Sequence, residues 1–417
     1  MATTILAWNI EELGVKFAGA GTNMAAFEAF RAQLVANVAA QAQANVIIIQ
    51  ELRAAGVGLL PILCTQLAAT IGGVWHYDWL PGALTQAAAA DFRDLGFTVP
   101  ANSEGYAVVW QAGRLTPLAG PPLSAGVDSP VFAPANQHFI TLITQGQTLT
   151  FEPSDEVPIQ FTGPGGVGLG FPPSTCPDVG NEVRTRAAVH RGNDTIASTT
   201  EVRRPCAVQL ANLDVPVVVY HAPVGQNASR SPYYGTLIGF ASDALQGPRA
   251  VYAGDFNVVS APDQRGLHQA SIDLGYDRST YAQHGSGGPV EPMASVVHYV
   301  NHGGDGFRTG PAGVLGSGRD YAFMRRGGLD GSIIVYDALT ALSTRLAGSA
   351  GLRANVQAAA RQPWFDQVIG GLRIGDIVLA YLDGTGLPPG TDTFTALAII
   401  YRKLISDHLP AAIRYHG

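Results

Sequence analysis

The sequence predicts an α/β protein built on a central sheet core, and three features support that class. Runs of branched aliphatic residues, such as NVIIIQEL at 45–52, are typical of strands buried on both faces. Apolar residues at helical spacing separate the first two such runs. The 50 glycines and 27 prolines indicate many loops and turns and argue against a helical bundle.

The first part of the chain alternates strands and helices. We predict strands at 4–10, 45–52 and 106–111, and helices at 22–42 and 57–71. From about 116 to 200 the chain is rich in Gly and Pro and poor in helical periodicity. We expect an insertion there with a few strands of its own, FITLIT and QTLTFE among them.

Regular patterns return after residue 205. We predict strands at 206–213, 215–223, 249–257 and 319–326, a helix at 232–246, and a last strand after LISDHLP. Two further insertions are expected at about 282–316 and 337–400, the second with helical patterning around LTALSTRL and ANVQAAARQPWF. No internal repeat is visible, so a single domain over 1–417 is expected, with insertions at about 116–200, 282–316 and 337–400.

Charge and cysteine content restrict the classes of partner and cofactor. The net charge is −7, so a nucleic-acid substrate would need a local basic patch or metal ions. Cys64, Cys176 and Cys206 include no CxxC pair and suit no zinc site. Cys176 and Cys206 could bridge in an oxidising compartment, but reduced, partly buried thiols are the simpler interpretation. MATTILAWNI has no basic region before an apolar run, so no signal peptide is predicted and a cytoplasmic location is expected.

The stretch from Ala54 to Tyr77 carries no formal charge apart from any protonation of His76 and is long enough to span a membrane. Pro61, several glycines, Gln66 and two threonines argue against a span. A buried helix containing LLPILCTQLAATIG is therefore the expectation.

Polar side chains able to handle metals or protons end most of the apolar strands. They are Asn9, Glu51, His221, Asp255 with Asn257, Asp320, and the pair Asp407–His408 before the last strand. Ligand sites of sheet-based folds gather at strand ends, where side chains converge. In GDFN, alternation along an extended chain would send Asp255 and Asn257 to one side and Phe256 to the other.

Each of these residues also has a simpler explanation. Asn9 and the Asp255–Asn257 pair could be turn residues, and a lone histidine such as His221 is more commonly a core residue. Taken together, however, the set is chemically coherent. Its hard oxygen atoms suit Mg²⁺ or Mn²⁺, and two histidines with spare carboxylates suit proton transfer and anion stabilisation.

The order of the motifs is itself informative. The chain contains, in order, WNI (8–10), IIIQE (47–51), GYAVVW (105–110), RRP (203–205), VVVYHAP (217–223), GDFN (254–257), RDYAF (319–323) and SDHLP (406–410). This ordered set resembles the endonuclease/exonuclease/phosphatase superfamily, which has the deoxyribonuclease I-like fold, and GDFN and SDHLP are its most specific marks. The resemblance implies an α/β four-layered sandwich of two packed mixed β-sheets flanked by helices, here with large loop insertions.

The resemblance also implies roles for individual residues. Glu51 would be the principal ligand of Mg²⁺ or Mn²⁺, assisted by Asn9 and Asp407. Asp255 would orient or deprotonate the attacking water, with Asn257 holding the water and the phosphate. His221 would donate to a phosphate oxygen, and His408 would be paired with Asp320. Tyr106 and one of Arg203 or Arg204 would also face the phosphate.

The implied activity is metal-dependent hydrolysis of phosphodiester bonds, most simply by a DNA endonuclease that binds nucleic acid through a local basic patch. Candidates for the patch are Arg184, Arg186, Arg191, Arg203, Arg204, Arg325 and Arg326. The alternative is a phosphatase or phosphodiesterase acting on a small-molecule or lipid phosphoester, because such members share the GD-x-N and SDH marks. A third possibility, a binding module without activity, would lack site residues, and none of the main set is missing.

Overall fold

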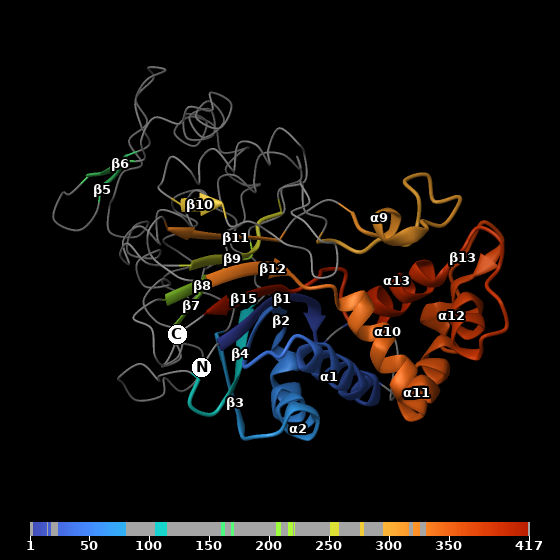
Figure 1. The fold of residues 1–417 in the computed structure, drawn as a ribbon, viewed down its shortest axis with the longest axis horizontal. Coiled ribbons are helices and arrows are strands. Elements are labelled where there is room, and N and C mark those ends of the chain that lie inside the picture. The colour runs from blue at the N-terminus through green and yellow to red at the C-terminus, as the bar shows by residue number, and fades with distance from the viewer. Residues whose placement is uncertain are drawn as a thin grey trace, which may run out of the picture.

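The computed structural model describes residues 3–14, 16–17, 24–80, 105–114, 160–162, 168–170, 206–209, 216–219, 221, 251–257, 276–278, 295–316, 320–325 and 331–415. Only the backbone is described for residues 80, 160–162, 168–170, 206–209, 216–219, 251–252, 276–278, 320–325, 331–334 and 415. The described elements include two mixed sheets, with helices packed against the larger one (Figure 1).

The larger sheet has six described strands in the order β12-β15-β1-β2-β4-β3. These strands are β1 (Thr3–Leu13), β2 (Val46–Leu52), β3 (Trp75–Leu80), β4 (Gly105–Gln111), β12 (Gly331–Val335) and β15 (Ala411–Tyr415). β1 and β2 run parallel, and the other neighbouring pairs run antiparallel. The branched aliphatic run Val46–Ile49 is completely buried, as its composition predicts for a strand covered on both faces.

The second sheet has five described strands in the order β10-β11-β9-β8-β7. They are β7 (Cys206–Gln209), β8 (Pro216–Val219), β9 (Val251–Asp255), β10 (Tyr276–Arg278) and β11 (Asp320–Arg325). β8 and β9 run parallel, and the remaining pairs run antiparallel. Two small hairpins, β5 (Gln160–Thr162) with β6 (Gly168–Gly170) and β13 (Val368–Ile369) with β14 (Leu372–Arg373), lie outside both sheets.

The two sheets pack together with β1 close to β9 and β11 close to β15. Among the described residues, hydrogen bonds link one sheet to the other, and two of them involve backbone amides. The amide of Asp255 donates to Oε1 of Gln50 at 3.1 Å, and the amide of His221 donates to the hydroxyl of Tyr106 at 3.0 Å. Both bonds lie at the end of the sandwich where the strand-end polar residues are found.

Helices α1 (Met24–Gln41) and α2 (Leu60–Ile71) lie on one side of the larger sheet (Figure 1). α1 is rich in alanine, which favours helix and allows close packing, and it buries Leu34, Val35 and Val38. α2 follows the 3₁₀-helix η2 (Ala54–Leu59) and packs against α1. Where β1 ends, Gly14 (φ 103°) lies so close to η2 that a Cβ atom would fall 2.1 Å from the amide nitrogen of Gly56.

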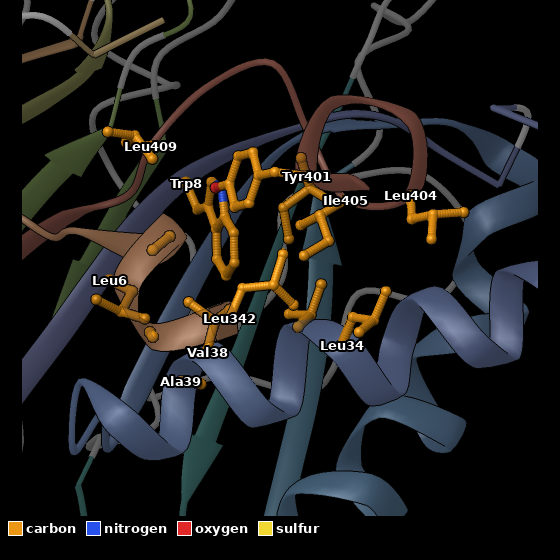
Figure 2. Close-up of a cluster of buried hydrophobic side chains, with 14 of the residues drawn as sticks. Leu6, Trp8, Leu34, Val38, Ala39, Leu342, Tyr401, Leu404, Ile405 and Leu409 are labelled. Atoms are coloured by element: carbon orange, nitrogen blue, oxygen red, sulfur yellow. The ribbon is translucent and has the colours of Figure 1, made fainter. Parts of the chain in front are cut away.

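A group of C-terminal helices continues the same core. It consists of α10 (Ala338–Gly348), α11 (Ala350–Ala360), α12 (Ile374–Asp383) and α13 (Thr393–Leu404), with the 3₁₀-helix η3 (Pro363–Phe365) between them. α10 packs on α1 and α13, and the ring of Tyr401 stacks on that of Trp8 at a centroid distance of 6.5 Å. Figure 2 shows Trp8, Leu34, Val38, Leu342 and Tyr401 converging from β1, α1, α10 and α13.

Most of the predicted elements are present with shifted boundaries. The strands predicted at 206–213 and 215–223 are shorter, as β7 and β8, and the helix predicted at 57–71 begins with a 3₁₀ segment. β3 and β12 were not predicted, although WHYDWL and GSIIV have strand-type composition. The helix predicted at 232–246 and the strands FITLIT and QTLTFE lie outside the described residues.

The expected helix containing LLPILCTQLAATIG is present, as the end of η2 and the whole of α2, but α2 is only partly buried. α2 buries one edge, formed by Leu60, Leu63 and Leu67, and its Pro61 and Thr65 are exposed. Residues 75–80 of the stretch and its continuation form β3. By length and composition one described segment, Ala54–Ile71, passes as a membrane span, with 33% of it buried; a core helix of a soluble protein passes the same test.

Candidate active site

The strand directions bring the predicted site residues to one end of the sandwich. The carboxyl ends of the parallel pairs β1–β2 and β8–β9 lie at this end. β4, β11 and β15 run antiparallel to these strands, so their amino ends lie there too. Tyr106 is paired with Gln50, and Asp320 is paired with Asp255. Residues from distant parts of the sequence therefore meet because each lies at a strand end.

Asn9 joins two carboxylates at the centre of the site. Its Nδ2 donates to Oε1 of Glu51 at 2.8 Å and to Oδ2 of Asp255 at 3.1 Å. Its Oδ1 accepts from the amide of Glu11 at 2.9 Å. Asn9 and Asp255 are almost completely buried, at 0% and 1% exposure, so the amide holds two carboxylates from different sheets close together.

Two histidines approach the same carboxylates. Nε2 of His221 lies 3.6 Å from Oε1 of Glu51 and 3.6 Å from Oδ2 of Asp255. Nε2 of His408 lies 3.4 Å from Oδ2 of Asp255 and 3.6 Å from Oδ1 of Asp407. Both imidazoles are buried. Asp255 is therefore the point at which both imidazoles and the Asn9 amide meet.

The GDFN segment forms a tight turn immediately after β9. The amide of Asn257 donates to Oδ1 of Asp255 at 2.8 Å, which is an Asx turn, and Asn257 has a left-handed backbone (φ 52°). The extended chain that we expected through Asn257 is therefore wrong, because the strand ends at Asp255. The turn explanation and the active-site explanation are compatible, since the turn fixes one carboxylate oxygen of Asp255 and leaves the other facing Asn9 and the histidines.

The SDHLP segment is held in place by residues to which the sequence assigned no role. Oγ of Ser406 donates to the carbonyl of Asn9 at 2.6 Å and accepts from the amide of His408 at 2.9 Å. The indole of Trp8 and the hydroxyl of Tyr401 both donate to the carbonyl of His408, at 3.0 and 2.8 Å. Ser406 lies within a recognised motif, whereas Trp8 and Tyr401 resemble ordinary core residues in sequence.

Glu51 and the end of β1 have unusual backbone conformations. Glu51, Glu11 and Glu12 have left-handed φ angles of 62°, 47° and 52°. Such conformations cost about 1–3 kcal/mol per non-glycine residue and cluster at functional sites. The pairing of β1 with β2 shifts register between Asn9 and Leu13, so Glu11 and Glu12 form a bulge. The bulge turns the amide of Glu12 onto Oε2 of Glu51, at 3.0 Å.

The remaining predicted site residues are placed less completely. Tyr106 is buried and uses its hydroxyl to accept from the amide of His221. The backbone of Asp320 lies opposite Asp255, but its side chain is not described, so its pairing with His408 stays a prediction. Arg203 and Arg204 lie outside the described residues, and so do Arg184, Arg186, Arg191 and Arg326; only the backbone of Arg325 is described.

The donor set is suited to a hard divalent cation bound through few protein ligands. Glu51, Asp255 and Asp407 contribute three carboxylates, and Asp407 is also paired with Arg402 at 3.3 Å. Among the described side chains, no group of three or more His, Cys, Asp or Glu forms a ready metal cage. Mg²⁺ usually binds through one or two carboxylates, with waters and substrate phosphate completing its octahedron, so the residues present fit that mode of binding.

This chain is similar, at low sequence identity, to several solved structures. An AP endonuclease from Archaeoglobus fulgidus has 10% identity and a TM-score of 0.42, with 100% of both chains covered. D. rerio TDP2, solved with a single-strand DNA product, has 11% identity and a TM-score of 0.40, with 100% of this chain and 99% of that chain covered. A Bacteroides thetaiotaomicron mannosyl-6-phosphatase has 10% identity and a TM-score of 0.36, covering 80% of this chain and 87% of that chain.

No protein-family model and no curated protein matches the sequence. The two packed mixed sheets, with the motif residues gathered at one end, have the architecture predicted from the motif order. The described part of the chain is a mixed α/β fold, and its membership of the endonuclease/exonuclease/phosphatase superfamily stays a prediction from the motifs. The outer helical layer expected on the five-stranded sheet falls outside the described residues.

Proposed function

We propose that this protein is a divalent-metal-dependent phosphoester hydrolase, and that it cleaves phosphodiester bonds in DNA as an endonuclease. The observation that carries the proposal is the convergence of Asn9, Glu51, His221, Asp255 and His408 from both sheets on one buried cluster. Carboxylates beside imidazoles supply both a base for water and donors for an anionic phosphate.

In this proposal Glu51 is the principal ligand of Mg²⁺ or Mn²⁺, with Asn9 and Asp407 in support. The cation, when bound, supplies positive charge that stabilises the pentacoordinate phosphate. Asp255 accepts a proton from the attacking water or orients it, and Asn257 holds the water and the phosphate. Tyr106 and Arg203 or Arg204 face the phosphate.

The two imidazoles complete the proposed chemistry. His221 donates to a non-bridging phosphate oxygen, and His408, charged or hydrogen-bonded, neutralises charge that develops in the transition state. Asn9 keeps the Glu51 and Asp255 carboxylates at a fixed separation, because its amide donates to both. The preorganised arrangement lowers the barrier because these groups need not reorient during the reaction.

The direct test is nicking of supercoiled plasmid with Mg²⁺, with EDTA, and over a range of salt. Wild type should nick only with the metal, and Glu51→Gln should lose about 100-fold or more of the rate. Asp376→Asn is the matched control, because Asp376 is an exposed carboxylate on α12 that pairs with Arg373. Metal-independent nicking, or equal rates for Glu51→Gln and Asp376→Asn, would contradict the assignment.

A second candidate is hydrolysis of a small-molecule or lipid phosphoester, and the burial of the site favours it. His221, Asp255 and His408 are 4%, 1% and 3% exposed, so a single phosphate group reaches them more easily than a duplex does. Phosphate release from sugar phosphates, inositol phosphates and nucleotides, and head-group release from sphingomyelin vesicles, would distinguish this candidate. Hydrolysis of one of these compounds without plasmid nicking would indicate a small-molecule or lipid substrate in place of DNA. The proposed catalytic residues would stay the same.

A further inference from the structure

Arg31 on α1 is a fully buried cation whose hydrogen bonds go to the backbone behind the candidate active site. Its side chain is 0% exposed. The guanidinium donates to the carbonyls of Glu11 and Glu12 and, through Nε and Nη2, to the carbonyl of Ile405 at 3.0 and 2.8 Å. One side chain therefore binds two chain segments that are far apart in sequence.

The first segment is the bulge that positions Glu51. The carbonyls of Glu11 and Glu12 accept from Arg31, while their amides donate to Oδ1 of Asn9 and Oε2 of Glu51. Both bulge residues have left-handed backbones, so this orientation of the peptides is not the one that an uninterrupted strand would adopt. Arg31 therefore binds the carbonyl groups of Glu11 and Glu12, the same two residues whose amide groups bind the side chains of Asn9 and Glu51.

The second segment leads directly into the SDHLP loop. Ile405, whose carbonyl Arg31 binds, precedes Ser406, and Ser406 bonds both to the carbonyl of Asn9 and to the amide of His408. The Arg31 contact therefore fixes the start of the segment that carries Asp407 and His408. The planar guanidinium can hold both segments at once, which the single ammonium of a lysine cannot reproduce.

Burial of this charge has a cost that packing alone does not offset. Glu28, one helical turn earlier, forms an ion pair with Arg31 at 3.5 Å and is itself 2% exposed. Buried ion pairs contribute little net stability, and desolvation lowers the pKa of Arg31 despite the neighbouring carboxylate. An apolar residue would serve helix packing at least as well, so the contacts with Glu11, Glu12 and Ile405 distinguish arginine at this position.

We propose that Arg31 is a positioning residue that couples the Asn9–Glu51 half of the site to the His408 half. The inference rests on the proposed hydrolase function for its kinetic consequence, but not for its structural one. Arg31 acts through the backbone of Glu11, Glu12 and Ile405 and contacts no substrate. The competing explanation is that Arg31 only satisfies buried carbonyls and stabilises the fold.

The test compares Arg31→Lys and Arg31→Met with Val35→Ala, a substitution of a buried residue on the same helix. Plasmid nicking by the Mg²⁺-loaded enzyme gives kcat and KM, corrected for the folded fraction from urea unfolding. We expect Arg31→Met to lower kcat about 10- to 100-fold with little change in KM, since small misplacement of catalytic groups has effects of that size. Arg31→Lys should recover part of the loss, and Val35→Ala should keep wild-type kcat per folded molecule.

Hydrogen–deuterium exchange gives a second measurement that needs no activity. In both Arg31 variants, amides of residues 9–13 and 405–409 should exchange faster, while those of 34–41 keep their protection. A merely structural role predicts unchanged kcat per folded molecule and the exchange pattern of Val35→Ala, and would overturn the proposal. If wild type hydrolyses no phosphoester, the hydrolase proposal fails, and the exchange experiment still decides whether Arg31 couples the two segments.

Discussion

Among individual residues, Lys16 is a second buried cation close to the candidate site. Its ammonium is 10% exposed and is paired with Glu11, on the bulge next to the candidate site. Its pKa falls from 10.5 to about 8, mainly because burial disfavours the charged form and secondly because the positive charge of Arg31 repels it. The folded protein therefore releases this proton at a lower pH than the unfolded chain does.

This difference predicts a pH dependence of stability. Between pH 8 and pH 10.5 the unfolded chain binds more protons at Lys16 than the folded protein does. The buried charge therefore lowers the free energy of unfolding most at low pH, and this destabilisation decreases as the pH rises above 8. From pH 8 to 9 the wild type should gain about 1 kcal/mol relative to Lys16→Met. Urea unfolding of both proteins at pH 7, 8 and 9 measures this difference. Parallel profiles would mean that Lys16 is not titrating in this range.

Site residues differed in how visible they were in the sequence. Asn9, Glu51, Asp255 and His408 could be predicted as candidates because each is a polar residue at the end of an apolar run. Gln50 and Arg31 could not, since a glutamine in a strand and an arginine in a helix are ordinary, and their partners lie about 200 and 370 residues away. Their roles depend on tertiary contacts that no local pattern records.

Among the elements, α13 is positioned most strongly by its cap. Oδ1 of Asp392 accepts from the amide of Thr395 at 2.8 Å, and the amide of Asp392 donates to Oγ1 of Thr395 at 3.2 Å. The other carboxylate oxygen of Asp392 accepts from the amide of Gly310 at the start of the short helix α9 (Gly310–Val314), at 2.6 Å. One side chain therefore starts α13 and ties it to a neighbouring segment.

Asp392→Ala should destabilise the protein by about 2 kcal/mol, at the upper end for loss of an N-cap, because the tie to Gly310 is lost as well. Asp337→Ala is the matched control. Asp337 caps α10 by accepting from Thr340, in an exposed position, and its loss should cost about 1 kcal/mol or less. Thermal unfolding of both variants gives the comparison, and equal losses would show that the Gly310 contact contributes nothing.

The element boundaries show what local pattern can and cannot decide. The 3.6-residue periodicity of 22–42 was sufficient to predict α1, and the β-branched run was sufficient to predict β2. β3 was not predicted, because its first three residues end the uncharged stretch 54–77, in which only a helix at 57–71 was predicted. α12 and α13 were not separated from their insertion, although Gly384 and Asp392 mark an end and a start.

At the scale of the whole molecule, the site depends on contact between the two sheets. Tyr106 of the larger sheet accepts from the amide of His221 in the segment that follows β8 of the other sheet. The expectation that Tyr106 faces phosphate stays a prediction, and the hydrogen bond gives its hydroxyl a second, structural task.

Tyr106→Phe removes this acceptor from a buried amide and should cost about 1–3 kcal/mol of stability. It should also lower the rate of hydrolysis, because His221 is positioned through the same bond. Tyr381→Phe is the control, because the hydroxyl of Tyr381 forms a hydrogen bond with Ser343 on α10 in a partly buried position. Its loss should reduce the stability by about 1 kcal/mol or less. Urea unfolding and turnover measure the two effects. Equal stability losses for the two variants would show that the bond from the His221 amide to Tyr106 contributes no more than an ordinary, partly buried hydrogen bond.

The class of the fold could be predicted from the sequence, but the strand order could not. Motifs such as GDFN and SDHLP indicate the architecture as a whole. The sequence contains no local signal that β15 lies between β12 and β1, because that arrangement is set by pairing between residues such as Ile5 and Ile413.

That pairing has a consequence for synthesis. β1 and β15 are adjacent strands, and Trp8 bonds to the carbonyl of His408 across 400 residues of chain. During translation β1 can pair with β15 only after β15 has left the ribosome, and until then that edge of β1 is exposed. Contacts of such high sequence separation fold slowly and leave unpaired strands vulnerable to aggregation. Since the same late segment brings His408 and Ser406, the nascent chain acquires its last strand and its completed site together.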